Sequence, residues 1–206
     1  MKKIRISSLL ALASLSMLLF DGCGKVRYPT SYVLEFPRPP IQPAVSRNSP
    51  GTIFVREFGC LEYLCRDRIV YRPSPEEVGF YEYHRWAMDP RRSVTQFVAD
   101  TLALRSGYEV RSLESPGGAD YILAGEIEHL EEVDRGGEVF VECVISGELV
   151  DVRTHSIVWR DRAAKTLAVD RRDMRGIVSN LTAAAQMVVD QLVTSAVKAL
   201  PPVPVQ

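Results

Sequence analysis

The sequence predicts an α+β domain in which a mostly antiparallel sheet is packed by two helices. Two long segments repeat apolar residues at intervals of three and four, as helices do, and an aspartate precedes each of them. The segments around them alternate apolar and polar residues, as strands do, and glycines or prolines separate these strands. We expect this to be a single domain that follows a signal segment and a proline-rich tether.

Residues 1–22 have the composition of an export signal. The chain begins Met-Lys-Lys-Ile-Arg and continues as an apolar run that ends in Phe20-Asp21-Gly22. A helix that spans a membrane needs roughly 20 apolar residues, and this run is shorter. A cationic start followed by a short apolar run is typical of a secretory signal, so residues 1–22 are excluded from the domain.

Cys23 directly follows this signal. The signals of bacterial lipoproteins end in a small residue followed by a cysteine that receives acyl chains, and Gly22-Cys23 fits this pattern, although Phe20-Asp21 is irregular. We predict that Cys23 is the lipidation site and that its acyl chains, such as palmitate, anchor the protein to a membrane. Plain signal cleavage or a packed cysteine is the alternative. Because Gly24 and not aspartate follows Cys23, we expect the outer membrane, with the body facing the periplasm.

Residues 23–50 are predicted to form a tether that contains one short edge strand. Four prolines favour an extended, semi-rigid chain, namely Pro37, Pro39, Pro40 and Pro43. The short run "SYVLEF" alternates as a strand does. The domain proper is expected at residues 51–200, with its first strands at 52–58, 68–72 and 77–87. We place a turn at Pro73-Ser74-Pro75, because a continuous central strand would not contain it.

The first helix is predicted to begin after Asp89 and to end at Gly107. Aspartate is a favoured N-cap, proline suits the first helical position and glycine commonly ends a helix. Strands are then expected at residues 108–113, 120–134, 138–153 and 156–167, with Gly136-Gly137 at a hairpin turn. The second helix is predicted from Asp173 to Leu200, and residues 201–206 are expected to be a disordered tail.

The charge balance gives no indication of nucleic-acid binding, because the chain has 25 basic and 26 acidic residues and a pI near 6.3. The three histidines are scattered without the spacing of a metal or catalytic motif. Several acidic residues gather between Glu126 and Asp134, and we expect them on a solvated face of the sheet. The sequence therefore predicts no cofactor, no metal site and no enzyme.

The four cysteines have different expected roles. Lipidation would use Cys23. Cys60 and Cys65 are close in sequence, and the exported compartment permits disulfides, so a bridge between them is one alternative and two reduced thiols are the other. Cys143 lies in an alternating strand pattern and is expected in the core.

Three motifs follow one another along the domain: Val70-Tyr71-Arg72, then Phe80-Tyr81 with Trp86, and then Ala119-Asp120-Tyr121-Ile122-Leu123-Ala124-Gly125. In this order and spacing they resemble the ABC-type transport auxiliary lipoprotein family, of the paraquat-inducible protein C type. The resemblance extends over roughly residues 30–195.

This resemblance implies a non-enzymatic component of the cell envelope. Such proteins assist transport systems made of a mammalian-cell-entry (MCE) domain protein, a permease and an ATPase, which move lipids between membranes. The lipoprotein would dock the MCE protein or receive lipid cargo, and a homo-oligomer is compatible with this role. Tyr71, Trp86 and Tyr121 match motif positions, where they are expected to pack in the core or, as the alternative, to form a partner surface.

Two other functions stay open. The first is a stand-alone periplasmic lipoprotein that binds a lipid or small molecule, and the second is an outer-membrane assembly factor.

Overall fold

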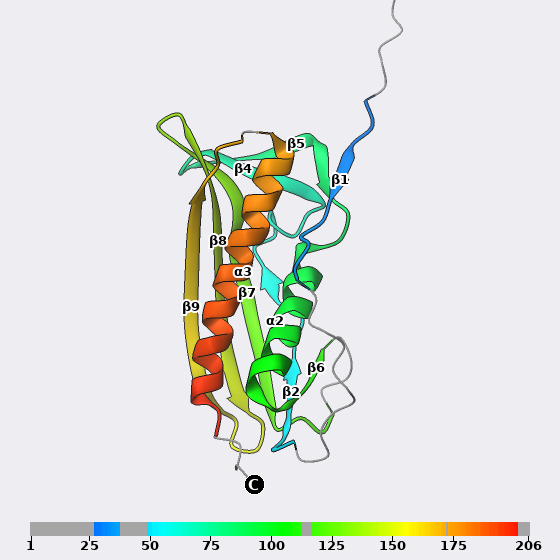
Figure 1. Ribbon diagram of the computed structural model, residues 1–206, viewed down its shortest axis with the longest axis vertical. Helices are drawn as coiled ribbons and strands as arrows, with labels where there is room; N and C mark the ends of the chain where they lie inside the picture. The colour runs from blue at the N-terminus through cyan, green and yellow to red at the C-terminus, as the bar shows by residue number, and fades with distance from the viewer. Residues whose placement is uncertain (1–26, 38–48, 113–116, 172, 202–206) are drawn as a thin grey trace, which may run out of the picture.

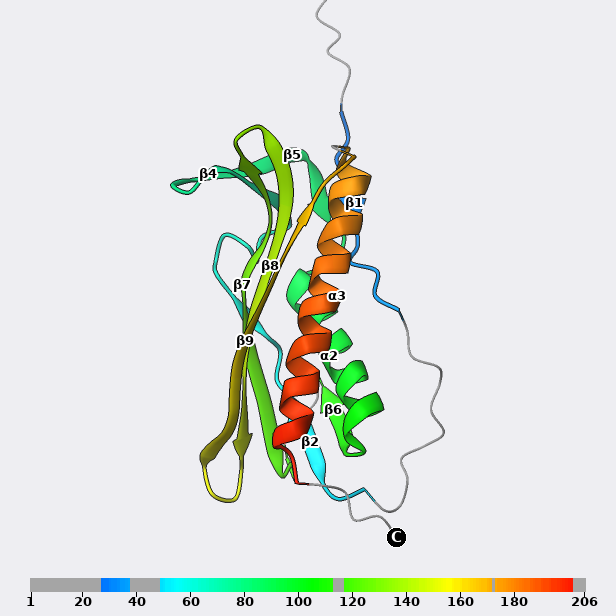
Figure 2. The same cartoon turned by 60° about the vertical axis from the view of Figure 1, so that its left-hand side comes forward.

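The computed structural model describes residues 27–37, 49–112, 117–171 and 173–201. In these residues one mixed sheet of nine strands carries two helices on one face (Figures 1 and 2). The predicted α+β class is confirmed. The predictions for the signal, for Cys23, for most of the tether prolines and for residues 202–206 lie outside the described residues. No helix in the described ranges is long and apolar enough to cross a membrane.

The sheet is built around β7, which pairs with β8 along its whole length on one side. On its other side β7 pairs in turn with β2, β3 and β4. The strands are β1 (Thr30–Tyr32), β2 (Thr52–Val55), β3 (Gly59–Cys60), β4 (Arg68–Ser74), β5 (Glu77–Trp86), β6 (Glu109–Ser112), β7 (Tyr121–Arg135), β8 (Glu138–Asp151) and β9 (Ser156–Ala168).

The long pairings, β7 with β8 and β8 with β9, are antiparallel, as is β4 with β5. The short pairings are parallel: β1 with β5, β2 with β6, and β2, β3 and β4 with β7. The sheet is therefore mixed, and most of its paired length is antiparallel, as predicted. Between β2 and β6 the chain passes through β3, β4, β5 and a helix, and parallel neighbours need such a long connection.

The turn between β4 and β5 differs slightly from its predicted position. Pro73 and Ser74 belong to β4, and the turn itself consists of Pro75 and Glu76. The pairing of β4 with β5 is irregular between Tyr71 and Ser74. Proline is tolerated at such an irregularity because no regular ladder hydrogen bond needs its missing N–H.

Both helices have the predicted ends. The first is α2 (Pro90–Ser106), whose N-cap Asp89 accepts a hydrogen bond from the Arg91 backbone N–H at 2.9 Å, and Gly107 ends it in the left-handed conformation with φ 72°. The second is α3 (Met174–Ala199), and its N-cap Asp173 accepts from the Gly176 backbone N–H at 2.7 Å.

The core lies between the sheet and the two helices. A stripe of α3 that includes Leu181, Ala185 and Val188 is buried there together with Cys143 and Ile145 of β8. In Figure 2 α3 runs along β8 and β9, and α2 lies beside it over β2 and β6. Both helices of the described residues thus lie on one face, and neither of them covers the opposite face of the sheet (Figure 2).

The described part of the predicted tether packs on the body. β1 joins the edge of the sheet, with Thr30 opposite His84 of β5. After β1, the Leu34 side chain is buried, and the ring of Phe36 stacks on Phe97 of α2 with centroids 4.3 Å apart. Residues 30–36 are therefore held by the domain.

Candidate functional site

A β-bulge in β7 decides which side of the sheet its acidic residues face. The register with β8 shifts between Ile127 and His129, so Glu128 is an extra residue on β7. Because side chains alternate along a strand, one extra residue moves every later side chain to the other face. Leu130 consequently faces the helices, and Glu131 faces the opposite side.

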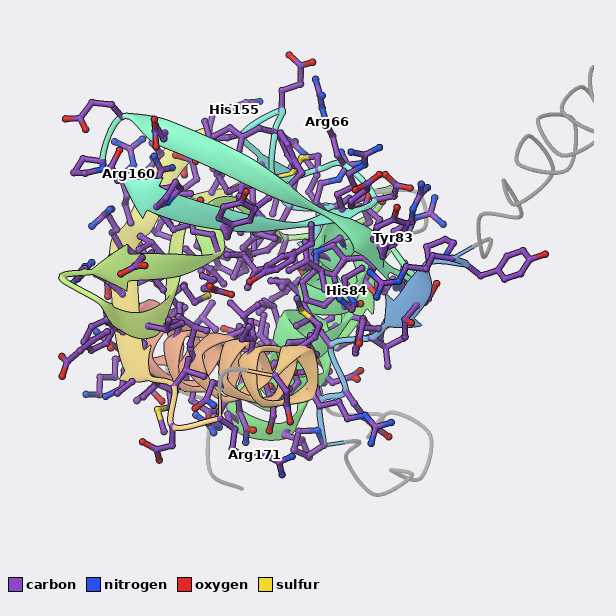
Figure 3. All side chains as sticks on the ribbon, turned by 90° about the horizontal axis from the view of Figure 1, so that it is seen from above. Arg66, Tyr83, His84, His155, Arg160 and Arg171 are labelled. Atoms are coloured by element: carbon purple, nitrogen blue, oxygen red, sulfur yellow. A yellow bond between two sulfur atoms is a disulfide. The ribbon has the colours of Figure 1, made fainter. Side chains whose placement is uncertain are left out.

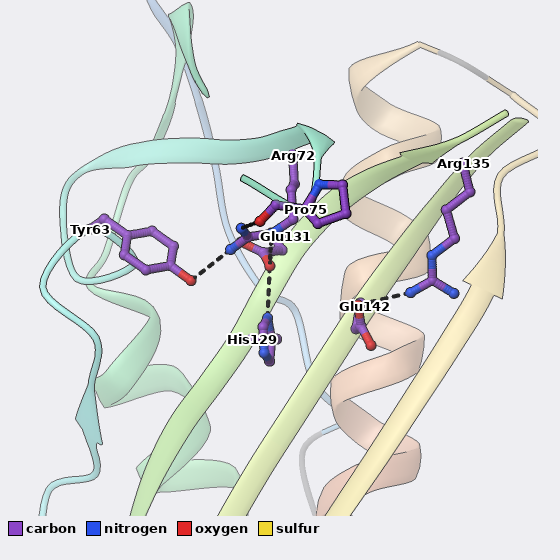
Figure 4. A network of polar contacts seen from close by, with 7 residues as sticks. All are labelled: Tyr63, Arg72, Pro75, His129, Glu131, Arg135 and Glu142. Carbon is purple, nitrogen blue, oxygen red and sulfur yellow. Dashed lines mark hydrogen bonds and ion pairs between the residues drawn. The ribbon is translucent and has the colours of Figure 1, made fainter. Parts of the chain in front are cut away.

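Glu131 is fully buried on that side, with 0% of its side chain exposed. Arg72 of β4 donates to it from Nε at 2.9 Å and from Nη2 at 3.3 Å, and Nδ1 of His129 lies 2.7 Å from Oε1. Arg72 also donates to the Tyr63 hydroxyl at 3.0 Å and to the Pro75 carbonyl at 3.1 Å. Figure 4 shows this network. The expectation that the acidic cluster of β7 is solvated is thus wrong for Glu131.

The ion pair also affects the titration of its neighbours. The hydrogen bond with Glu131 raises the pKa of Arg72 above its usual value. Burial raises the pKa of the Tyr63 hydroxyl, and the negative charge of Glu131 acts in the same direction, against the lowering effect of Arg72. Arg72 is thus a cation and the Tyr63 hydroxyl is neutral at ordinary pH. Since the oxygens of Glu131 are already engaged, the arrangement fits a structural ion pair and not a general base.

Beside this network is an open pocket of about 570 Å³. Cationic and apolar side chains share its wall with two carboxylates, and it is lined by Arg72, Pro73, Ser74, Pro75, His129, Val133, Asp134, Arg135, Gly136 and Glu142. Arg135 Nη2 lies 3.2 Å from Glu142. A hollow with an apolar wall and a few charged groups is the usual form of a small-molecule site.

The motif residues Tyr71, Trp86 and Tyr121 do not share one surface. Trp86 is buried, with 6% of its surface exposed, whereas Tyr71 and Tyr121 are half-buried. Tyr71 lies opposite Gly79 and beside Glu132 near one end of β7, and Tyr121 is at the other end of β7. No single partner surface therefore contains all three residues.

Cys60 and Cys65 form a disulfide in the structure, with Cα atoms 6.0 Å apart. This disulfide closes the short loop of residues 60–65, which places the Tyr63 hydroxyl beside Arg72. Cys143 is a buried thiol in β8, and burial raises the pKa of this thiol to about 12. Within the described ranges, no group of three or more His, Cys, Asp or Glu side chains is arranged to hold a metal ion.

Sequence reasoning missed the pairing of Arg72 with Glu131, because these residues are 59 positions apart. No spacing rule connects two residues at such a separation. The only signal was indirect: "VYR" and the acidic run of the next long strand would lie close together if the two strands were neighbours.

Solved structures with a similar fold were found. Protein XCC0632 from Xanthomonas campestris aligns with a TM-score of 0.69 at 18% identity, over 82% of this chain and 96% of that one. An uncharacterised protein aligns with a TM-score of 0.65 at 14% identity, over 82% and 99%. The hypothetical protein CT253 from Chlamydia trachomatis aligns with a TM-score of 0.50 at 9% identity, over 72% and 96%. These identities establish a common fold alone.

A search of curated proteins found no match. A family model described as ABC-type transport auxiliary lipoprotein component matches residues 32–194, which is most of the chain and nearly all of the folded body. The chain therefore belongs to the ABC-type transport auxiliary lipoprotein family.

Proposed function

We propose that this protein is a non-catalytic lipoprotein of the outer membrane that assists an MCE-type lipid transporter. The single observation that carries the proposal is the family match over residues 32–194 in a chain whose apolar first segment ends in Gly22-Cys23. Acyl chains on Cys23 hold the body at the membrane, and the body docks the MCE protein or receives its lipid cargo.

The chemistry of the body supports a role without catalysis. Its one fully buried carboxylate among the described residues, Glu131, is held by Arg72 and His129 inside the fold. Groups that are satisfied in this way stabilise a shape, and a stable shape is what a docking subunit requires.

The anchor is tested by two substitutions in cells. Cys23→Ser removes the acylated thiol, so we expect no incorporation of labelled palmitate and loss of the protein from membrane fractions. Gly24→Asp keeps the thiol but places aspartate after it, and we expect a palmitate-labelled protein that moves from outer-membrane to inner-membrane fractions. Incorporation of palmitate into the Cys23→Ser variant would refute the anchor.

The partner is tested by crosslinking in cells followed by purification of the lipoprotein and identification of what is attached. We expect an MCE-domain protein, with its permease and ATPase at lower yield. The Gly24→Asp variant is the control, because a protein kept at the inner membrane should lose contacts made at the outer membrane. If no MCE protein is recovered from the wild type, the proposal fails.

The pocket beside Arg72 favours a second candidate, a lipoprotein that binds a small molecule by itself. Arg72, His129 and Arg135 would attract an acidic group, and Pro73 and Val133 would contact an apolar part of the ligand. Native mass spectrometry of protein purified from its own membranes should then show a bound mass that the Arg135→Glu variant loses. A wild-type protein without additional mass would count against this candidate.

A further inference from the structure

Exposed apolar side chains gather where the chain enters the folded body. Tyr28 is 82% exposed, Val33 46%, Tyr83 36% and Met88 51%. They come from two neighbouring segments, residues 28–33 and 83–88, because β1 pairs in parallel with the end of β5. Beyond the paired residues, the Ala87 backbone N–H donates to the Tyr32 carbonyl at 2.7 Å. We call Tyr28, Val33, Tyr83 and Met88 the entry strip.

One residue of the entry strip, Tyr83, contacts Arg27 at the start of the described chain. The Arg27 guanidinium lies over the Tyr83 ring, 5.6 Å from its centroid. Figure 3 shows Tyr83 directly beside β1, on the outside of the body. Arg85, on the same strand, is paired with Asp67 at 2.6 Å. The local surface thus combines apolar and aromatic groups with arginines.

The length of chain before the strip limits its distance from the anchor. Arg27 follows Cys23 by four positions, and four fully extended residues span at most about 14 Å. An acylated Cys23 lies at the surface of the bilayer. The end of the entry strip beside Arg27 cannot then be separated from the headgroups by more than this short link, so the longer proline-rich stretch after β1 does not set the reach of the body.

From this geometry we propose that the entry strip contacts the bilayer that holds Cys23, with Tyr28 and Tyr83 at the level of the headgroups. This inference rests on the proposed lipidation. Tyrosine favours the membrane interface because its ring is apolar and its hydroxyl is polar. Arg27, whose guanidinium lies over the Tyr83 ring, is placed to meet lipid phosphates.

This contact orients the molecule. In Figure 1 β1 and the β4–β5 hairpin are near one end of the long axis, and the β8–β9 turn and the end of α3 are at the other. With the entry strip on the bilayer, the β8–β9 end points into the periplasm. A partner that comes from the inner membrane would meet that end first.

Depth-dependent fluorescence of the acylated full-length protein tests the proposal in vesicles of phosphatidylethanolamine and phosphatidylglycerol. Tyr28→Cys and Tyr83→Cys carry an environment-sensitive dye, and Leu104→Cys and Met187→Cys are the controls. Leu104 and Met187 are 46% and 49% exposed and lie on α2 and α3. The native chain without an added cysteine gives the background, because Cys143 is buried and Cys60 is bridged to Cys65.

We expect the dye at positions 28 and 83 to be quenched by spin-labelled lipids several-fold more strongly than the dye at positions 104 and 187. Equal quenching at all four positions in protein that floats with the vesicles would overturn the entry-strip contact and leave the anchor intact. Protein that does not float would overturn the anchor as well. A concentration-dependent blue shift at positions 28 and 83 without vesicles would assign the strip to a second copy of the chain and overturn the proposal.

Discussion

The Arg72–Glu131 pair illustrates how a charge is kept inside this small domain. Removing a carboxylate from water is costly, and it is tolerated where several donors surround it in good geometry. Glu131 has two donors from Arg72 and a third contact from His129. Arg72 is itself only 17% exposed, and its other N–H groups bind Tyr63 and Pro75. The pair therefore joins β4, β7 and the disulfide-closed loop.

Removal of Arg72 should be far more damaging than removal of an exposed partner. We expect Arg72→Met to lower the free energy of unfolding by about 3–5 kcal/mol, because Glu131 would stay buried without its cation. The control is Arg162→Met, which breaks the Arg162–Glu128 pair at 2.7 Å, where Arg162 is 56% exposed. Such surface pairs contribute at most about 1 kcal/mol. Urea unfolding of both variants measures the difference, and similar losses would contradict the buried-pair interpretation.

The pairing of β7 with β8 depends on two glycines that face each other, Gly125 and Gly147. A Cβ on Gly125 would overlap the Phe58 ring and come within 2.5 Å of the Ser146 carbonyl. Phe58 is only 2% exposed, so its ring has little room to move. At Gly147 the Trp159 ring lies over the backbone, and Trp159 Nε1 donates to Ser195 of α3 at 2.9 Å. The absent side chains thus let two large rings, those of Phe58 and Trp159, pack in the core against the sheet.

Substitution of Gly125 should therefore be costly. We expect Gly125→Ala to lower the free energy of unfolding by about 1–3 kcal/mol, the usual range for overpacking a core. Gly59→Ala on the neighbouring strand is the matched control, because its added Cβ would meet its nearest atom at 3.8 Å, an ordinary contact distance. Thermal unfolding compares the two variants. A Gly125→Ala protein as stable as Gly59→Ala would show that the sheet adjusts without cost.

The start of α2 makes stability depend on pH. Burial of Asp89 would raise its pKa, but hydrogen bonds from the Arg91 side chain and backbone outweigh this and hold the pKa below its ordinary value of 3.8. A group whose pKa is lower in the folded state stabilises the protein above the unfolded pKa. This contribution is lost as the pH falls through the folded value.

Two substitutions of Asp89 separate the cap from its charge. We expect Asp89→Ala to lower the free energy of unfolding at pH 7 by about 1 kcal/mol, because the helix loses its N-cap. Asp89→Asn keeps an acceptor for the Arg91 N–H, so it should lose less at pH 7. Urea unfolding between pH 7 and pH 3 should show a smaller loss of stability for both variants than for the wild type. A loss as steep as in the wild type would exclude Asp89 as the titrating group.

The whole molecule includes a segment that precedes the main run of elements. β1 and the residues after it cross from β5 to α2, and Leu34 and Phe36 pack against the core. Residues 30–36 are therefore part of the folded unit.

If residues 30–36 belong to the fold, their buried side chains should contribute to global stability. Leu34 is 7% exposed, and we expect Leu34→Ala to lower the free energy of unfolding by about 2–3 kcal/mol. Val33, its exposed neighbour at 46%, provides the control, because Val33→Ala should change stability by less than about 0.5 kcal/mol. Denaturant unfolding that showed no difference between the two would indicate that the segment separates from the body before it unfolds.

Both helices could be predicted almost to the residue from the amino-acid sequence. Asp89, Gly107 and Asp173 act on the chain within a few positions of themselves, so their effects can be read locally. The strands of the β7–β8–β9 meander could be predicted for the same reason, since alternation and the Gly136-Gly137 turn are local features. The family motifs, and the prediction of an export signal that ends before Cys23, depend only on the order of residues.

The mixed character of the sheet, the burial of Glu131 and the parallel pairing of β1 with β5 could not be predicted in this way. Each depends on contacts between residues far apart in the chain: Arg72 with Glu131, and Thr30 with His84. The bulge at Glu128 is a single-residue change of register, and it reverses the face on which the later acidic residues lie. Local preferences give the elements of this protein, whereas packing between distant segments selects their neighbours and thereby creates the charged network and the exposed strip at the chain entry.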